Sequence, residues 1–194
     1  MDSTPSILTI GHSRHPLERL IALLDAAQVT AIVDVRSAPA SRFSPQFNKK
    51  ALAASLATRN IAYEFFGKEL GGRPEREELY TQGVADYEKM AATSEFRAGM
   101  GRLVELAKQH RVAVMCAEAD PLDCHRCLLV GRALAESGRE VAHILPSGEI
   151  ITQRAVEDNL LKFEGLAEAD LLQSRAERLA DAYRARNRKA AHQR

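Results

Sequence analysis

The residues best suited to chemistry lie in one short segment that contains all three cysteines of the 194-residue chain. Cys116-Ala-Glu118 is followed, after five residues, by Cys124-His125-Arg126. A cysteine at the start of a helix tends toward the thiolate form, because free backbone N–H groups and the helix dipole favour negative charge there. The segment therefore predicts a nucleophile, Cys124 or Cys116, beside groups that can move protons or hold an anion.

Glu118 and two histidines are the candidates for proton transfer. Glu118 comes just after an apolar run, where partial burial raises the pKa of a carboxyl group and suits it to act as an acid or a base. Glu118 can equally be the fixed partner of an arginine. His125 adjoins Cys124, and His12 follows Gly11, whose small size permits a tight turn and close approach to a ligand. A structural role for His12 stays open.

Three arginines, Arg36, Arg42 and Arg126, are candidates for binding a phosphate or a carboxylate, because a guanidinium group can donate two parallel hydrogen bonds to either. The structural alternative is that Arg126 only pairs with Asp34 or Glu118 and that Cys124 only caps a helix. The remaining residues that we expect to contribute to binding are small or polar and stand near the predicted strand ends: Gly11, Ser13, Asp34 and Ser41.

A metal site is a competing interpretation of the same segment. Cys116, Cys124, Cys127 and His125 are ligand types that zinc prefers. The zinc-deaminase signature does not fit, because its two halves begin separate helices, and five residues between Glu118 and Cys124 leave no room for that. Side chains at 124 and 125 would also diverge from a helix start. We therefore predict no metal and no cofactor, and we expect Cys127 to pack in the core.

The elements that must position these residues alternate between strand-length apolar runs and helical periodicity, which predicts parallel strands with right-handed crossovers. In such sheets ligands bind at the carboxyl ends of the strands, which is where the polar residues fall. We expect an α/β fold: a three-layer Rossmann-like domain over residues 6–165 with a mainly parallel sheet of about five strands, then a C-terminal amphipathic helix and basic tail over 166–194. The expected strands are 7–10, 31–35, 61–66, 112–116 and 141–145, and the expected helices lie near 17–24, 48–59, 84–91, 95–109 and 124–137.

Composition limits the class of protein. Apolar residues make up 45% and charged residues 27% of the chain, and the net charge of +1 excludes a polyanion binder by bulk charge. The segment from Arg175 onward carries seven basic residues against two acids, and Leu171, Leu172, Leu179 and Tyr183 suggest an amphipathic helix there. The tail is either a docked helix with a solvated end or an arm that contacts nucleic acid.

The expected compartment is the cytoplasm. The odd, clustered cysteines do not resemble a secreted disulfide framework. Residues 1–6 lack the basic and apolar regions of a signal peptide, and no run approaches the ~18 apolar residues of a membrane span. We therefore expect no membrane association.

The order of several motifs resembles a bacterial and archaeal family known as domain of unknown function 488. The resemblance runs from about Thr9 to Leu145 and implies a compact α/β domain with the same polar residues singled out, but no substrate. It rests on Thr9-Ile-Gly-His-Ser13, Val33-Asp-Val-Arg36, Pro39-x-Ser41-Arg42, Pro45-x-Phe47, Leu70-Gly-Gly72, Met115-Cys-Ala-Glu118 and Cys124-His-Arg126.

These observations favour an enzyme, a hydrolase or a transferase, that acts on a phosphate-bearing small molecule or a nucleic-acid component. Arg36, Arg42 and Arg126 would hold the anion, and Glu118 with His12 or His125 would move protons. One alternative is a non-catalytic module that binds a nucleotide, or nucleic acid through the basic tail. The other is a redox or metal sensor based on the cysteines.

Overall fold

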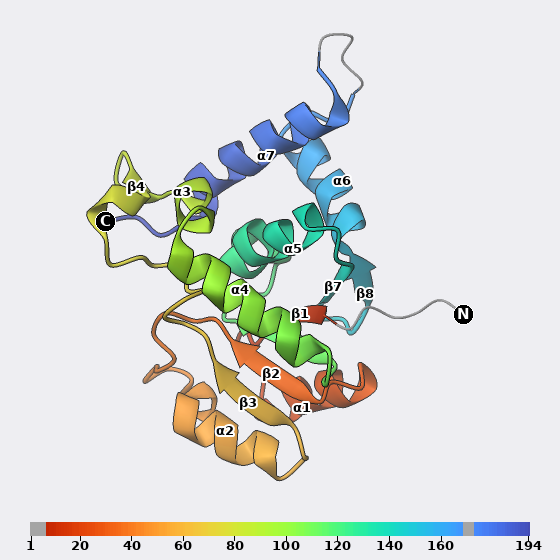
Figure 1. Ribbon diagram of the computed structural model, residues 1–194. Coiled ribbons are helices and arrows are strands. Elements are labelled where there is room, and N and C mark those ends of the chain that lie inside the picture. The colour runs from red at the N-terminus through yellow and green to blue at the C-terminus, as the bar shows by residue number, and fades with distance from the viewer. Residues whose placement is uncertain (1–6, 169–172) are drawn as a thin grey trace.

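A six-stranded sheet organises the molecule, whose computed structural model describes residues 7–168 and 173–194 (Figure 1). Its strand order is β3-β2-β6-β1-β7-β8, and every neighbouring pair is parallel except β7 and β8. This confirms the expected mainly parallel sheet and adds one antiparallel edge strand. The strands are β1 (Ile7–Gly11), β2 (Ala31–Asp34), β3 (Ala62–Phe65), β6 (Val112–Cys116), β7 (Val141–Ile144) and β8 (Ile150–Thr152).

The central strands form because they are apolar along their whole length. Every residue of β1, β2, β6 and β7 is buried, as expected for parallel strands that are covered on both faces. The edge strands differ, since β3 is only half-buried and β8 exposes Ile150. Sequence periodicity did not indicate β8, because an exposed strand of three residues has no continuous apolar run.

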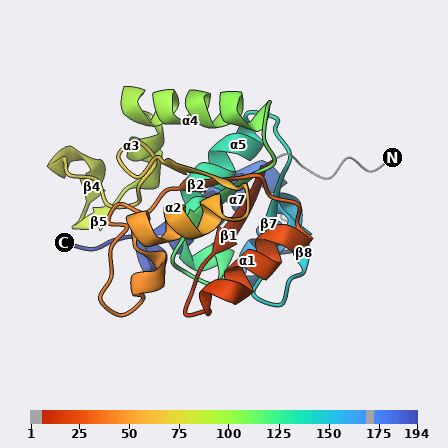
Figure 2. The ribbon, with the colours of Figure 1, turned by 90° about the horizontal axis from the view of Figure 1, so that it is seen from below.

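Helices cover both faces of the sheet and complete three layers (Figure 2). One face packs against α1 (Leu17–Ala26) and α2 (Lys49–Ala57), which share a core with alternate residues of the strands. The other face carries a second core built with the remaining helices. Those helices are α3 (Tyr87–Ala91), α4 (Ser94–Ala107), α5 (Arg132–Glu136), α6 (Gln153–Phe163) and α7 (Arg175–Ala190).

Two expected helices have different starts in the structure. Helix α3 begins at Tyr87 because the Asp86 side chain accepts hydrogen bonds from the first free N–H groups, whereas 84–85 form strand β5 (Val84–Ala85) of a small hairpin with β4 (Tyr80–Thr81). The expected helix at 124–137 begins with the π-helical segment η4 (Arg126–Gly131) and continues as α5. A 3₁₀ turn, η3 (Pro121–Asp123), precedes it.

The C-terminal helix α7 is docked on the α/β layers. Ala182 and Tyr183 are buried, and the Ser174 and Glu177 side chains form a capping box at its start. The expected contributions of Leu171 and Leu172, like the signal-peptide prediction for residues 1–6, lie outside the described residues. Within 7–168 and 173–194, no helix has the length and apolar character needed to cross a bilayer.

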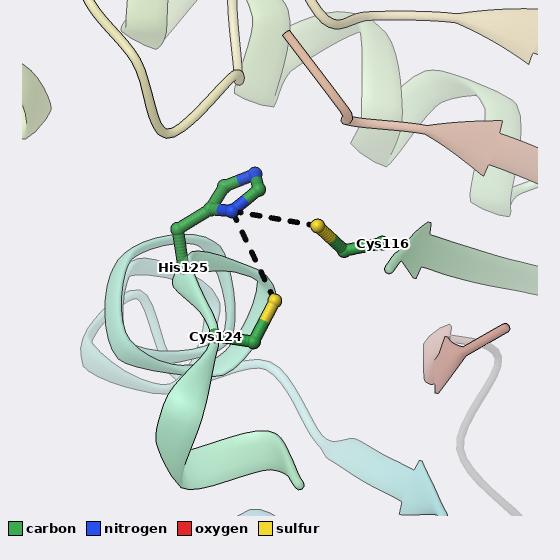
Figure 3. A group of neighbouring side chains, drawn as sticks. All are labelled: Cys116, Cys124 and His125. Atoms are coloured by element: carbon green, nitrogen blue, oxygen red, sulfur yellow. Dashed lines mark hydrogen bonds between the residues drawn. The ribbon is translucent and has the colours of Figure 1, made fainter. Parts of the chain in front are cut away.

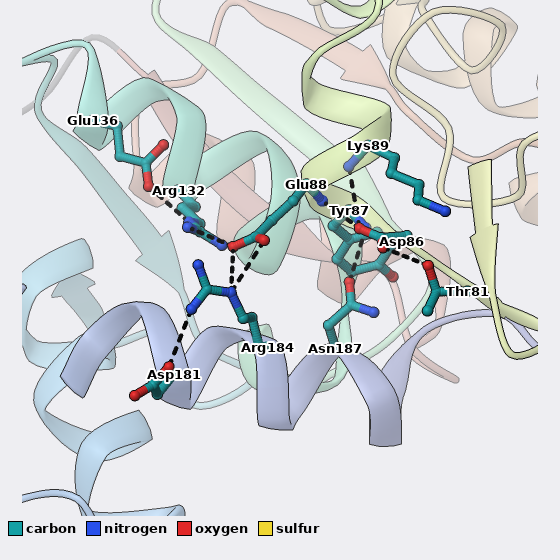
Figure 4. A network of polar contacts seen from close by, with 10 residues as sticks. All are labelled: Thr81, Asp86, Tyr87, Glu88, Lys89, Arg132, Glu136, Asp181, Arg184 and Asn187. Atoms are coloured by element: carbon teal, nitrogen blue, oxygen red, sulfur yellow. Dashed lines mark hydrogen bonds and ion pairs between the residues drawn. The ribbon is translucent and has the colours of Figure 1, made fainter. Parts of the chain in front are cut away.

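Many basic side chains of α7 face acidic partners. Arg184 bonds Glu88 and Asp181, and Glu88 also receives Arg132 from α5 (Figure 4). Arg186 pairs with Asp123, and Lys189 lies 2.6 Å from Glu164. These pairs account for much of the positive charge that the sequence concentrates here. Contact with nucleic acid through this segment stays a prediction.

Candidate functional site

The carboxyl ends of β1, β2 and β6 lie side by side, because β6 pairs with both of its neighbours in the sheet. Gly11 is in register with Cys116, and Asp34 with Met115. Residues far apart in the chain therefore converge at one edge, as the sequence predicted. Two groups of polar side chains result. We call Cys116, Glu118, Cys124 and His125 the thiol cluster, and His12, Asp34, Arg36 and Tyr63 the ion-pair cluster.

The thiol cluster brings two sulfur atoms, a carboxylate and an imidazole within contact of one another. Glu118 Oε2 lies 3.0 Å from both Cys116 Sγ and Cys124 Sγ. His125 Nδ1 lies 3.6 Å from Cys116 Sγ and 3.9 Å from Cys124 Sγ (Figure 3). Cys116, Cys124 and His125 are buried, and their two Sγ atoms and the ring nitrogen lie within 4.8 Å of one another. Chemically, the group can carry a proton, a disulfide or a metal ion.

Cys124 and His125 point to the same place because the helix begins after them. Cys124 is still extended (φ −138°, ψ 137°), and His125 is the first residue with helical angles (φ −60°, ψ −23°). The sequence argument assumed that both residues lie in the first helical turn, where adjacent side chains diverge. The extended conformation of Cys124 removes that divergence, so both side chains reach Cys116 at the end of β6 (Figure 3).

The His125 ring is held by its surroundings. Its Nε2 lies 3.0 Å from the carbonyl oxygen of Val35, which can only accept, so Nε2 carries a proton whether the ring is neutral or charged, and Nδ1 is the ring atom that faces the sulfur atoms. Gly72 packs against the ring, since a Cβ at this position would lie 2.7 Å from His125 Cγ. Gly72, the last residue of the Leu70-Gly-Gly72 motif, therefore makes room for the imidazole.

Burial and mutual contact shift the pKa values of the cluster in opposite directions. Burial acts to raise the pKa of the Cys124 thiol, but the hydrogen bond from Cys116 and the charges of Arg126 and His125 hold it well below its usual range. Contact with Cys124, followed by burial, raises the pKa of Cys116 well above its usual range. Burial and the negative Cys124 raise the pKa of Glu118. The cluster thus favours one thiolate among groups that keep their protons.

A polar pocket of about 290 Å³ opens over the thiol cluster. Cys116, Glu118 and His125 line it, whereas Cys124 is 1% exposed and lies behind them. The rest of the lining comes from three loops, from the start of α3 and from the C-terminal segment. These further residues are Arg36, Ser37, Ala38, Ala40, Gly72, Arg73, Tyr87, Ala117, Asp123, Ala190 and His192.

Arg126 holds the turn that carries Glu118. Its side chain is fully buried, and Nη1 and Nη2 donate to the carbonyl oxygens of Glu118 and Ala119 at 2.6 and 2.9 Å. Gly11 allows this turn to cross the end of β1, because a Cβ there would lie 1.8 Å from the Glu118 carbonyl oxygen. The close approach expected at Gly11 is therefore made by the chain itself, and anion binding by Arg126 stays a prediction.

The ion-pair cluster is closed around Asp34. Arg36 donates to both carboxylate oxygens, from Nε at 2.9 Å and from Nη2 at 2.6 Å, and the Tyr63 hydroxyl donates at 2.6 Å. Arg36 Nη1 lies 3.2 Å from His12 Nε2, and Nη2 also donates to the carbonyl oxygen of Phe47. His12 stacks on the Phe47 ring, and burial lowers the pKa of its imidazole to about 4.

The other predicted binding residues lie away from the pocket lining. Ser13 has a left-handed backbone (φ 50°) and donates its N–H to the Ala117 carbonyl. Ser41 and Arg42 are exposed, and the Arg42 guanidinium lies over the Phe43 ring. Ser41 accepts from Phe43 N–H within the same loop. Their expected contact with an anion is not tested by this arrangement and stays a prediction.

Five polar pocket residues were not singled out from the sequence: Ser37, Arg73, Tyr87, Asp123 and His192. Arg73 follows the Gly-Gly motif, which was a usable signal. Among the described residues its guanidinium has no ion-pair partner. Tyr87 and His192 carry no local motif, and only the packing of α3 and the C-terminal segment brings them to the pocket.

Fold and site together define a three-layer α/β protein with a thiol-rich cluster at the carboxyl edge of a mainly parallel sheet. The family model described as "Domain of unknown function DUF488" matches residues 16–133, which include the whole thiol cluster. The chain belongs to this family, and the resemblance noted in the sequence is confirmed. Comparison with curated proteins and with solved structures gave no match.

Proposed function

We propose that this protein is an enzyme, a hydrolase or a transferase, that acts on a phosphate-bearing small molecule or a nucleic-acid component. One observation carries the proposal. The Glu118 carboxylate contacts two thiols and shares with Cys116 and His125 the lining of a polar pocket. Polar groups that converge in a concave site, with buried reactive side chains, are the usual basis of an active site.

Glu118 is the residue that we assign to proton transfer. Its carboxylate borders the pocket, so it can reach a bound molecule and the sulfur atoms at once. Cys116, Cys124 and His125 form the reactive centre that Glu118 serves. A positioned acid or base contributes about 10²–10⁴-fold to rate.

Substrate recognition is assigned to the pocket walls. Arg73 is the cation we expect to meet an anionic group, because the guanidinium groups of Arg36 and Arg126 already donate to Asp34 and to backbone carbonyls. Arg36 still lines the pocket and adds positive potential there. A volume of about 290 Å³ suits a small molecule or a single nucleotide component.

The test is a screen of phosphomonoesters, phosphodiesters and nucleotides with the full chain, followed by single variants. Glu118→Gln, Cys116→Ser and Cys124→Ser should each lower kcat by about 10²-fold or more. Cys127→Ser is the matched control, because Cys127 is equally buried but lies nearest Gln153, outside the pocket lining. Arg73→Ala should raise KM more than it lowers kcat.

Retention of full activity in the three cluster variants would refute the proposal. Binding of a nucleotide that is unchanged in those variants and lost in Arg73→Ala would instead support a non-catalytic module.

A further inference from the structure

We propose that Cys116, Cys124 and His125 bind a zinc ion at the base of the pocket through their two Sγ atoms and Nδ1. A catalytic role for the ion rests on the proposed function. The binding of the ion is argued from the geometry alone. The proposal replaces the expectation of no metal, which depended on diverging side chains at positions 124 and 125.

The distances fit a tetrahedral zinc ion. Bond lengths of about 2.3 Å to sulfur and about 2.05 Å to nitrogen place a thiolate and an imidazole about 3.6 Å apart across a tetrahedral angle. The observed distances from His125 Nδ1 to the two sulfur atoms are 3.6 and 3.9 Å. The three side chains can therefore take up an ion with small adjustments of their rotamers (Figure 3).

The surroundings of His125 are those of a metal ligand. Histidines that bind metals commonly donate their second ring N–H to a carbonyl or a carboxylate, which fixes the tautomer and aims the free lone pair at the ion. Here Val35 O takes that hydrogen bond at 3.0 Å, and Gly72 confines the ring. This contact is independent of the sulfur distances, and it leaves Nδ1 as the atom directed at both cysteines.

The elements that carry the ligands give the site an open side. Cys116 ends the buried strand β6, and Cys124 is anchored just before η4, so two ligands sit on rigid backbone. Cys116 and His125 line the pocket, which makes a fourth coordination position accessible from it. Three protein ligands and one open position are typical of catalytic zinc, and two thiolates with an imidazole select zinc over magnesium or calcium.

The charge of the ion is balanced by the two cysteines, which leaves Glu118 as a base. Two thiolates neutralise a divalent ion, and each gives up the S–H that it donates to Glu118 without the ion. The Glu118 carboxylate, which also lines the pocket, is thereby released to take a proton from a water molecule in the fourth position. The water oxygen keeps the electron pair and becomes a bound hydroxide, and Glu118 becomes the carboxylic acid. Cys127 is excluded as a ligand because its Sγ is directed at Gln153.

The test is metal binding by the full chain, purified under reducing conditions and stripped with a chelator. The wild type should take up one equivalent of Zn²⁺, and Co²⁺ should give thiolate-to-cobalt charge-transfer absorption and the d–d bands of a tetrahedral site. Cys116→Ser, Cys124→Ser and His125→Asn should each weaken Zn²⁺ binding by more than about tenfold, and Cys127→Ser should bind like the wild type.

The wild-type cobalt spectrum decides the proposal even if a variant fails to fold. Absence of the charge-transfer band, equal loss in Cys127→Ser, or a Cys116–Cys124 disulfide in place of metal would overturn it. Stoichiometric zinc without turnover on any substrate would keep the ion site and remove the proposed enzyme. Turnover that persists after complete chelation would keep the enzyme and remove the catalytic role of the ion, whereas its binding is judged by the cobalt spectrum.

Discussion

The ion-pair cluster and the thiol cluster lie at the same edge of the sheet, but they satisfy their polar groups in different ways. Around Asp34, the negative charge receives donors from Arg36 and Tyr63, and each donor is matched by an acceptor. In the thiol cluster, three acidic groups, Cys116, Glu118 and Cys124, contact one another. The ion-pair cluster, whose charges are matched internally, therefore holds a loop in place. The thiol cluster, whose acidic groups contact one another, can instead bind a cation or a proton.

The largest effect should come from opening the closed cluster. Asp34→Asn leaves Arg36, whose side chain is 9% exposed, without its counter-charge, and we expect a loss of about 3–5 kcal/mol of unfolding free energy in urea titrations. Asp25→Asn is the matched control, because Asp25 pairs with Arg59 at 3.8 Å on the surface and should cost well under about 1 kcal/mol. Equal losses of unfolding free energy in the two variants would show that the buried Asp34–Arg36 pair matters no more than a surface pair.

A third buried group, formed by Thr9, His143 and Gln153, carries no charge in the folded protein, and its contribution to stability should depend on pH. His143 is buried, bonds Thr9 and Gln153, and has a pKa lowered to about 4 by burial. The unfolded chain takes up this proton near pH 6.5, so stability should fall by about 3 kcal/mol as the pH drops from about 6.5 to about 4. Urea titrations across this range should show a steeper loss in the wild type than in His143→Gln. Parallel slopes would show that His143 is not held neutral.

The thiol cluster should gain stability from metal where the ion-pair cluster does not. At free Zn²⁺ a hundredfold above its Kd, the wild type should be stabilised by about 2.7 kcal/mol, provided that the unfolded chain binds the ion weakly. Thermal denaturation with and without Zn²⁺ measures this gain. Cys127→Ser should keep the gain and Cys124→Ser should lose it. A gain of the same size in Cys124→Ser would place the bound ion elsewhere.

The smallest effect is expected on the surface, where charges are paired but hydrated. Arg184 and Glu88, whose side chains are 50% and 42% exposed, join α7 to α3 (Figure 4). Arg184→Ala should cost about 0.2–1 kcal/mol and should be nearly neutral at high salt. Urea titrations at two salt concentrations provide the check. A loss as large as that of Asp34→Asn would mean that α7 docking depends on this network.

The sheet could be predicted because its central strands are apolar on both faces, and Gly11, Cys116 and Asp34 fall at their ends. Alternation of strands and helices then determined which edge these residues share. Strand β8 was missed because its three residues are largely exposed. Helix α6 was missed although its signal is present, because Val156, Leu160 and Leu161 recur at helical spacing among charged residues.

The roles of the site residues were harder to predict, because each depends on a partner from a distant segment. The Arg36 and Arg126 side chains suit an anion by chemistry, yet Asp34 and the carbonyls of Glu118 and Ala119 receive their hydrogen bonds. The convergence of Cys124 and His125 depends on backbone angles that no residue type indicates. The periodicity of apolar residues predicts helices and strands. The partners of polar atoms depend on the three-dimensional arrangement of distant segments.

The contribution of His192 to the pocket has a consequence for synthesis of the protein. The segment that carries His192 is held by backbone hydrogen bonds to the β4–β5 hairpin, about a hundred positions earlier in the chain. A ribosome must therefore release nearly all of the described polypeptide before this wall of the pocket can close. Until then Cys116 and Glu118 lack one wall of the pocket that they line in the folded protein.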